Sequence, residues 1–169
     1  MASKYEIRGF TKSSLTAVEN RWRGLAGEDE FASELAGFFQ WCHTHIAPKA
    51  GDSQAHGLFN KEDESCDAII ELVETTTLGG KTKLLKLITS PHFWQSIDLD
   101  RERLITLYTW TFTLVIAKGI LGKAKDVKLY ARDDLMLSFL RSLHAHWDVP
   151  GTKAEFQGRF LTVTKETKK

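Results

Sequence analysis

The chain has little of what marks specialised classes of protein. It contains only two cysteines, Cys42 and Cys66, and its net charge at pH 7 is +1. Two cysteines cannot form a disulfide framework, so we expect both to be unpaired thiols in a reducing compartment. A net charge this close to zero excludes an overall electrostatic attraction to nucleic acid or to an acidic membrane surface.

Long apolar runs are also missing. The first ten residues, MASKYEIRGF, have no apolar core of a signal peptide, and no stretch of about twenty apolar residues stands out. We therefore expect a cytoplasmic protein that is neither exported nor inserted in a membrane. The lysines within residues 165–169 predict a short, solvated basic tail rather than a binding patch.

The composition is that of one folded domain, which we expect to span residues 1–169. Hydrophobic residues make up 42% of the chain and charged residues 27%, a balance that excludes extensive disorder. A chain of 169 residues can bury a sizeable core. Its five tryptophans leave room for a homodimer surface.

The first third of the chain indicates a strand followed by helices. Tyr5–Phe10 is a candidate strand, and Thr16 and Glu19 have the spacing of a capping box for the helix that follows. A second helix, which we expect to end at Pro48, has an apolar face that would pack on a sheet. The residues on that face are Phe31, Leu35, Phe38, Phe39, Cys42 and Ile46.

The next part of the chain predicts an antiparallel meander. Three extended runs between Ala55 and Thr89 are separated by an acidic turn and by Gly79-Gly80. In the run 68–74, apolar residues fall on both faces, which is typical of a central strand.

Residues 98–119 carry conflicting signals. The aromatic and threonine residues in 108–114 alternate as in a strand, whereas the whole run is too long for a strand, begins with acids and ends in Ala-Lys-Gly. We predict a helix, with an apolar stripe facing a sheet. The stripe comprises Leu104, Tyr108, Phe112 and Val115.

From residue 81 the chain reads strand, helix, strand, helix, strand. The five segments are KTKLLKLITSP, DRERLITLYTWTFTLVIAKG, DVKLYA, RDDLMLSFLRSLHAHW and GRFLTVTK. With the extended runs before it, this order resembles the GNAT (Gcn5-related N-acetyltransferase) family. The resemblance implies an α/β (α+β) fold with a central mixed, twisted sheet and helices on both faces. It also implies a splayed parallel pair, made by 84–89 and 127–130 and joined by a right-handed crossover.

In that family acetyl-CoA or another acyl-CoA lies in the gap between the splayed strands, which here would place Leu87, Ile88 and Thr89 against the coenzyme. The family's phosphate loop is rich in glycine, but residues 90–103 contain none. Asp98 and Asp100 instead suit the cap of the next helix. We therefore predict a degenerate phosphate loop and weak binding of acetyl-CoA.

Two arginines beside this loop could bind phosphate. Arg101 and Arg103 could do so through charged hydrogen bonds, or they could belong to a solvated, charged first turn of the helix.

The resemblance also suggests two catalytic roles. Glu71, in an apolar strand, is the candidate base, its alternative being a solvent-facing carboxylate. Phe139 stands near the place of the family's tyrosine acid, so Ser138 is the nearest candidate acid and Phe139 itself suits a core position. The acceptor would be a small-molecule or peptide amine.

No metal site is predicted, because the paired histidines 43/45 and 144/146 are two residues apart, which places them on nearly opposite sides of a helix. Two functions remain open at this point. The chain is either a divergent GNAT-like N-acyltransferase or a non-catalytic GNAT-fold module that binds another ligand or a protein.

Overall fold

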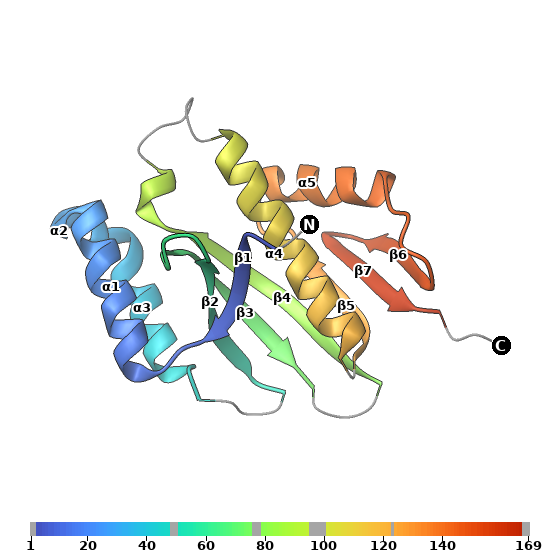
Figure 1. The fold of residues 1–169 in the computed structure, drawn as a ribbon, viewed down its shortest axis with the longest axis horizontal. Coiled ribbons are helices and arrows are strands. Elements are labelled where there is room, and N and C mark those ends of the chain that lie inside the picture. Colours follow the sequence, from blue (N-terminus) through green and yellow to red (C-terminus); the bar gives the residue numbers. More distant parts are fainter. Residues whose placement is uncertain (1–2, 48–50, 76–78, 95–100, 123, 167–169) are drawn as a thin grey trace.

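The fold is a seven-stranded mixed sheet with helices on both faces, seen in a computed structural model (Figure 1). The structure describes residues 3–47, 51–75, 79–94, 101–122 and 124–166. The strand order is β1-β2-β3-β4-β5-β7-β6, and within it only β4 and β5 pair in parallel. The predicted α/β class with a mixed sheet is confirmed.

The chain begins with β1 (Tyr5–Gly9) and α1 (Lys12–Ala26), and the predicted position of the capping box is wrong. The N-cap is Thr11, whose hydroxyl accepts a hydrogen bond from the Ser14 amide at 3.1 Å. The Ser14 hydroxyl in turn accepts one from the Thr11 amide at 2.9 Å. Thr16 lies inside α1, where its hydroxyl donates to the Lys12 carbonyl. The serine at the third helical position therefore caps the Thr11 amide, the role that a glutamate commonly has in a capping box.

The second predicted helix is present in three pieces. They are α2 (Glu28–Glu30), the π-helical turn η1 (Phe31–Leu35) and α3 (Ala36–Thr44). Phe31, Leu35, Phe39 and Cys42 of the predicted face are buried. α3 ends at Thr44, and Pro48 lies outside the described residues.

The antiparallel meander is confirmed. β2 (Ser53–Asn60), β3 (Cys66–Glu74) and β4 (Gly80–Thr89) pair in sequence order. β3 is central, with Ile69 and Ile70 both fully buried although they point to opposite faces. The turn between β2 and β3 is the predicted acidic one.

Residues 109–114 are helical, as predicted. They belong to α4 (Arg101–Leu121), which crosses from β4 to β5 (Ala124–Tyr130) after the short turn η2 (Pro91–Phe93). Glu102–Leu121 has a mean hydropathy of 1.6 and could cross a membrane by length and composition alone. Within the fold its apolar residues pack on the sheet, and the core helix of a soluble protein passes the same test. The proposed caps Asp98 and Asp100 lie outside the described residues.

The C-terminal part contains a strand that the sequence patterns did not reveal. After α5 (Asp134–Ala145), β6 (Thr152–Gln157) and β7 (Phe160–Lys165) form a hairpin whose turn includes Gly158 at φ 61°. β7 lies between β5 and β6, so the last strand is internal. Lys165, the first residue of the predicted basic tail, is the last residue of β7 and donates to the Gly122 carbonyl.

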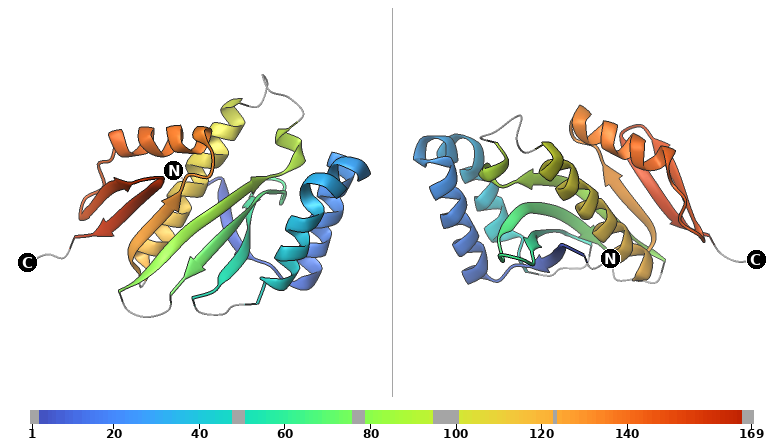
Figure 2. Two further views of the ribbon diagram at one scale, coloured as in Figure 1. Left: turned by 180° about the vertical axis from the view of Figure 1, so that it is seen from behind. Right: turned by 45° about the horizontal axis from the view of Figure 1, so that its top comes forward.

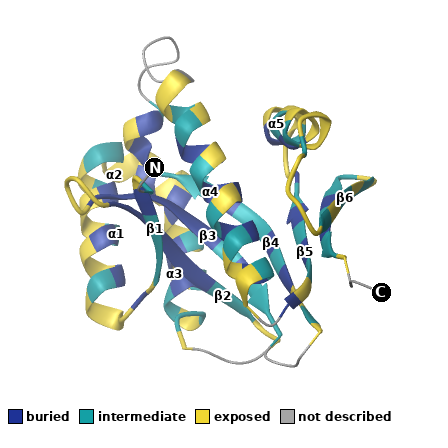
Figure 3. Cartoon of the chain, turned by 45° about the vertical axis from the view of Figure 1, so that its right-hand side comes forward, coloured by how far each residue is buried: buried dark blue, intermediate teal, exposed yellow. Residues whose placement is uncertain are grey.

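Two hydrophobic clusters lie on opposite faces of the sheet, and the helices divide between them (Figure 3). α1, η1 and α3 cover β2 and β3 on one face, around Trp22 and Ile69. α4 and α5 share the other face, where Tyr108 packs on Phe139 with ring centroids 5.3 Å apart. Phe139 is therefore a partly buried aromatic packed against the core, which agrees with the structural interpretation of this residue.

The buried His56 of β2 generates a prediction about stability and pH. Burial lowers the pKa of His56, and no described group hydrogen-bonds its Nδ1. The folded protein therefore binds a proton on this ring less readily than the unfolded chain, which protonates it below about pH 6.5. The stability contribution is thus complete above about pH 6.5 and is lost as the pH falls below that value.

We expect the unfolding free energy, measured in urea between about pH 7.5 and 5.5, to fall with pH more steeply in the wild type than in His56→Gln. The difference in slope should not exceed about 1.4 kcal/mol per pH unit, the value for one proton. His144→Gln, at an exposed position, is the control and should keep the wild-type slope. Equal slopes for the wild type and His56→Gln would contradict the prediction.

Candidate functional site

The two parallel strands, β4 and β5, separate midway along β4. Their paired residues run from Gly80 and Ala124 to Leu84 and Leu129, and β4 then continues to Thr89 paired only with β3. Figure 2 shows the two strands side by side at one end and diverging toward the other. The predicted parallel pair of these two strands is therefore confirmed, although the paired residues of β4 are 80–84 rather than 84–89. Residues 85–89 form the splayed segment instead.

A β-bulge lies where the strands separate. Glu71 of β3 pairs with Lys86, and the next residue, Leu72, pairs with Leu84, so Leu85 has no partner in β3. A bulge bends its strand and increases the local twist. This bend falls directly after the last residue of β4 that pairs with β5, and it turns the rest of β4 away from β5.

Glu71 lies beside this bulge, on the face of the sheet that α3 covers. Its side chain is 14% exposed. It accepts a hydrogen bond from the Ser53 hydroxyl at 2.7 Å, and the Lys86 ammonium lies 3.6 Å from its other oxygen. Lys86 in turn lies over the ring of Trp41, 5.3 Å from its centroid. The predicted base is thus a largely buried carboxylate that forms an ion pair with Lys86.

The three residues predicted to contact a coenzyme lie in the splayed segment. Leu87 packs in the core beneath α4, and Ile88 packs on the opposite face. Thr89 accepts a hydrogen bond from the indole of Trp94 at 3.3 Å. On the side away from β3, the backbone of 85–89 has no strand partner among the described residues.

The other predicted site residues lie elsewhere. Ser138 is exposed on α5, whereas Met136 and Leu140 of the same helix are buried. Arg101 begins α4, and Arg103, two residues further along, donates from Nη1 to His92 Nε2 at 2.9 Å. The structure therefore brings Glu71 close to the splayed segment and leaves Ser138 on the surface.

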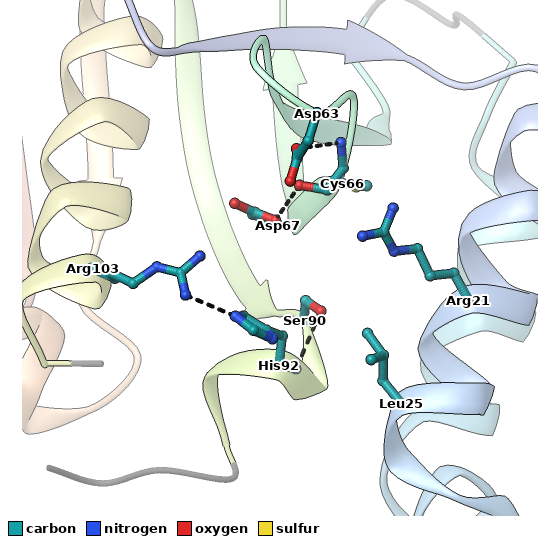
Figure 4. Close-up of a pocket in the computed structure, with 9 residues that line it drawn as sticks. Arg21, Leu25, Asp63, Cys66, Asp67, Ser90, His92 and Arg103 are labelled. Carbon is teal, nitrogen blue, oxygen red and sulfur yellow. Dashed lines mark hydrogen bonds between the residues drawn. The ribbon is translucent and has the colours of Figure 1, made fainter. Parts of the chain in front are cut away.

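A polar cavity that the sequence did not predict lies at the carboxyl end of β4 (Figure 4). Its volume is about 180 Å³, and charged groups of both signs line it. We call it the arginine–aspartate pocket. Its polar lining includes Arg21 of α1, Asp63 of the β2–β3 turn, Asp67 of β3, Ser90, His92 of η2 and Arg103 of α4.

Asp67 is the most buried charged group of this pocket, being only 7% exposed. One of its oxygens accepts from the Tyr5 hydroxyl at 2.9 Å and the other from the Ser65 hydroxyl at 2.8 Å. Burial, reinforced by the charge of Asp67, raises the pKa of Tyr5, so that the phenol remains a donor. The only sequence signal for this network is the cluster of acids around the turn.

Neither cysteine contributes a reactive group to these sites. Both thiols are free and buried. Burial raises the pKa of Cys42 to about 12 and also raises the pKa of Cys66. Among the described residues, no group of three or more histidine, cysteine or acidic side chains could hold a metal ion.

This architecture is similar to that of solved GNAT structures. A possible acetyltransferase from Clostridium difficile 630 matches with a TM-score of 0.53 and 12% identity, over 90% of this chain and 97% of that one. Apo FdhC, a nucleotide-linked sugar GNAT, matches with a TM-score of 0.52 and 10% identity, over 96% and 86%. The predicted resemblance is confirmed as a likeness of fold, and the chain has the GNAT fold. No family model and no curated protein matches the sequence.

The Asp67 network generates a second prediction. Tyr5→Phe leaves one oxygen of a buried carboxylate without its donor, so we expect the unfolding free energy to fall by about 1.5–3 kcal/mol. Tyr130→Phe is the matched control, because no described residue hydrogen-bonds the Tyr130 hydroxyl and its ring packs on Phe160. Equal losses in the two variants in urea unfolding would show that the hydroxyl of Tyr5 has no special role.

Proposed function

We propose that this protein is a GNAT-fold N-acyltransferase, which transfers an acetyl or other acyl group from acyl-CoA to an amine. The observation that carries the proposal is the separation of β4 from β5 after Leu84, with a bulge at Leu85 and the carboxylate of Glu71 beside it. Ligands of open α/β sheets lie at the carboxyl ends of parallel strands, where neighbouring connections diverge.

The splayed segment fits one part of an acyl-CoA. Residues 85–89 present a strand edge that lacks a strand partner among the described residues, and such an edge pairs well with an extended chain of amides. In the proposal Leu87, Ile88 and Thr89 hold the amide-containing arm, while Arg101 and Arg103 meet the phosphates. When bound, the coenzyme supplies an acyl group activated as a thioester.

The acceptor amine must lose a proton before it can attack. In the proposal Glu71 takes this proton at a carboxylate oxygen, directly or through one water. Its ion pair with Lys86 must open for this to occur, and the Ser53 hydroxyl keeps the carboxylate oriented meanwhile. The departing thiolate receives its proton from Ser138 or from water, and water is the simpler source because Ser138 is exposed on α5.

Calorimetric titration with acetyl-CoA tests the coenzyme part of the proposal. Because the phosphate loop has no glycine, we expect saturable binding with a dissociation constant above the micromolar range. Arg159→Gln, at an arginine that pairs with Asp134, is the control for removing a positive charge. Sub-micromolar binding that is lost in Arg101→Ala or Arg103→Ala would contradict the prediction of weak binding. Complete absence of binding to any acyl-CoA would favour the non-catalytic module instead.

Glu71→Gln tests the catalytic part. The amide keeps the shape of the side chain and can still accept from Ser53, but it cannot take a proton. We expect the rate of acyl transfer to fall by about a hundredfold or more, with coenzyme affinity unchanged. Glu74→Gln is the matched control on the same strand, since Glu74 pairs with Lys118 of α4. Unchanged turnover in Glu71→Gln would remove this residue from the mechanism.

A further inference from the structure

Lys86 lies within the splayed segment itself, next to the carboxylate proposed as the base. Its backbone pairs with that of Glu71 across β3 and β4. Its ammonium nitrogen, Nζ, lies 3.6 Å from Glu71 Oε2. The fold therefore brings a primary amine of its own chain to the place where the proposed transfer needs an amine.

We propose that Lys86 is a site of self-acylation, at which the protein transfers an acyl group from acyl-CoA to its own Nζ. The inference rests on the proposed function, because it uses the same donor and the same base. It goes beyond that function by naming an acceptor and a site of covalent modification.

The atoms of the step balance without any further reagent. The Lys86 ammonium gives one proton to Glu71, which leaves a lone pair on Nζ. Nζ forms a bond with the carbonyl carbon of the thioester, and the carbon–sulfur bond breaks with its electron pair on sulfur. The proton that nitrogen loses as the amide forms goes to the thiolate, and Glu71 returns its own proton to water. The products are a neutral amide at Lys86, which can no longer pair with Glu71, and free CoA.

The side chain of Lys86 is held in position by aromatic rings as well as by the carboxylate. Nζ lies 5.3 Å from the ring centroid of Trp41 and 5.8 Å from that of Phe38. These two rings of α3 are stacked, with their centroids 5.8 Å apart. A cation is attracted to the faces of aromatic rings, so the rings and Glu71 together restrict the position of Nζ. An amine that is already positioned loses less entropy when it reacts.

Lys86 is also accessible to a ligand. Its side chain is 31% exposed, whereas that of Glu71 is 14% exposed. In the proposed function the arm of acyl-CoA lies along residues 85–89, so the donor and the amine meet at the same stretch of β4. Direct proton transfer needs a separation of about 2.6–3.2 Å, and such contacts commonly shorten when the ligand binds.

A second lysine–glutamate pair provides an internal reference. Lys118 of α4 lies 3.3 Å from Glu74, and its side chain is 41% exposed. Glu74 pairs with Thr82, near the start of β4 and away from the splayed segment. If exposure or a nearby carboxylate alone determined acylation, Lys118 would react at least as fast as Lys86. Preference for Lys86 therefore requires the splayed segment.

The test is mass spectrometry of the whole chain after incubation with millimolar acetyl-CoA. We expect peptide mapping to find acetylation of Lys86 at least about tenfold faster than that of Lys118. An N-hydroxysuccinimide ester of acetate, which needs no coenzyme site, should label Lys118 at least as fast as Lys86. The inference would be overturned by a lack of acetyl-CoA labelling at Lys86 or by equal labelling of the two lysines. The same preference for Lys86 with both reagents would also overturn it, because the amine would then be reactive by itself.

Variants separate the acceptor from the base. Lys86→Arg keeps the positive charge but cannot lose it, so this variant should bind acetyl-CoA as the wild type does and gain no acetyl group at position 86. Glu71→Gln should slow acetylation of Lys86 by at least about tenfold, because the amide cannot take a proton. Glu74→Gln is the matched control and should leave that rate unchanged. An unchanged rate in Glu71→Gln would contradict the inference.

The dependence on protein concentration shows whether the transfer stays within one chain. We expect a rate constant that is the same at all protein concentrations, since the base and the acceptor belong to the same molecule. A rate constant that rises in proportion to protein concentration would indicate transfer between molecules and would overturn the inference.

Two measurements on the same samples separate this inference from the proposed function. They are the binding of acetyl-CoA and the release of free CoA thiol in the presence of phenethylamine or glycinamide. Binding and repeated turnover with an added amine, without acetylation of Lys86, would overturn the self-acylation alone. Absence of binding, turnover and acetylation would overturn both proposals.

Discussion

Strands β4 and β5 separate after Leu84 because the bulge at Leu85 turns the rest of β4 out of the common twist of the sheet. The backbone groups of residues 85–89 on that side then have no strand partner in the described part of the chain, which a sheet interior does not tolerate without a ligand or cover. The separation also sets the span that α4 must bridge. Helix α4 therefore packs across both strands, and its buried residues join the two halves of the sheet into one core.

The types of most elements could be predicted from the sequence, and the reasons differ from one element to another. In α4 the alternation of aromatics and threonines suggested a strand, but the length of the run favoured a helix. The buried residues Tyr108, Phe112 and Val115 do have helical spacing. β6 was missed because TKAEFQ carries only two apolar residues on its inner face and lies at the edge of the sheet, where little is buried. The register of β4 on β5 depends on the bulge, and nothing in a single sequence places an extra residue in one strand.

Some features of the candidate site could also be predicted from the sequence, and others could not. Glu71 could be predicted because an acid within an apolar central strand is unusual, and the fold does place it beside the bulge. The ion pair of Glu71 with Lys86 could not be predicted, because it depends on the register of β3 on β4. The arginine–aspartate pocket was unpredictable for a further reason. Arg21 and Arg103 are each unremarkable on their own helices, and only the packing of α1 and α4 around the end of β4 brings them to one cavity.

The end of β4 also connects the two regions physically. Ser90, which directly follows the splayed segment, donates its amide to the Asp67 carbonyl at 2.8 Å, and its hydroxyl accepts from the His92 amide. The backbone that leaves the splayed segment is thus held by the residue that forms the acidic side of the pocket. Ser90 is itself buried, so the end of the splayed segment and the acidic side of the pocket share one fixed backbone connection.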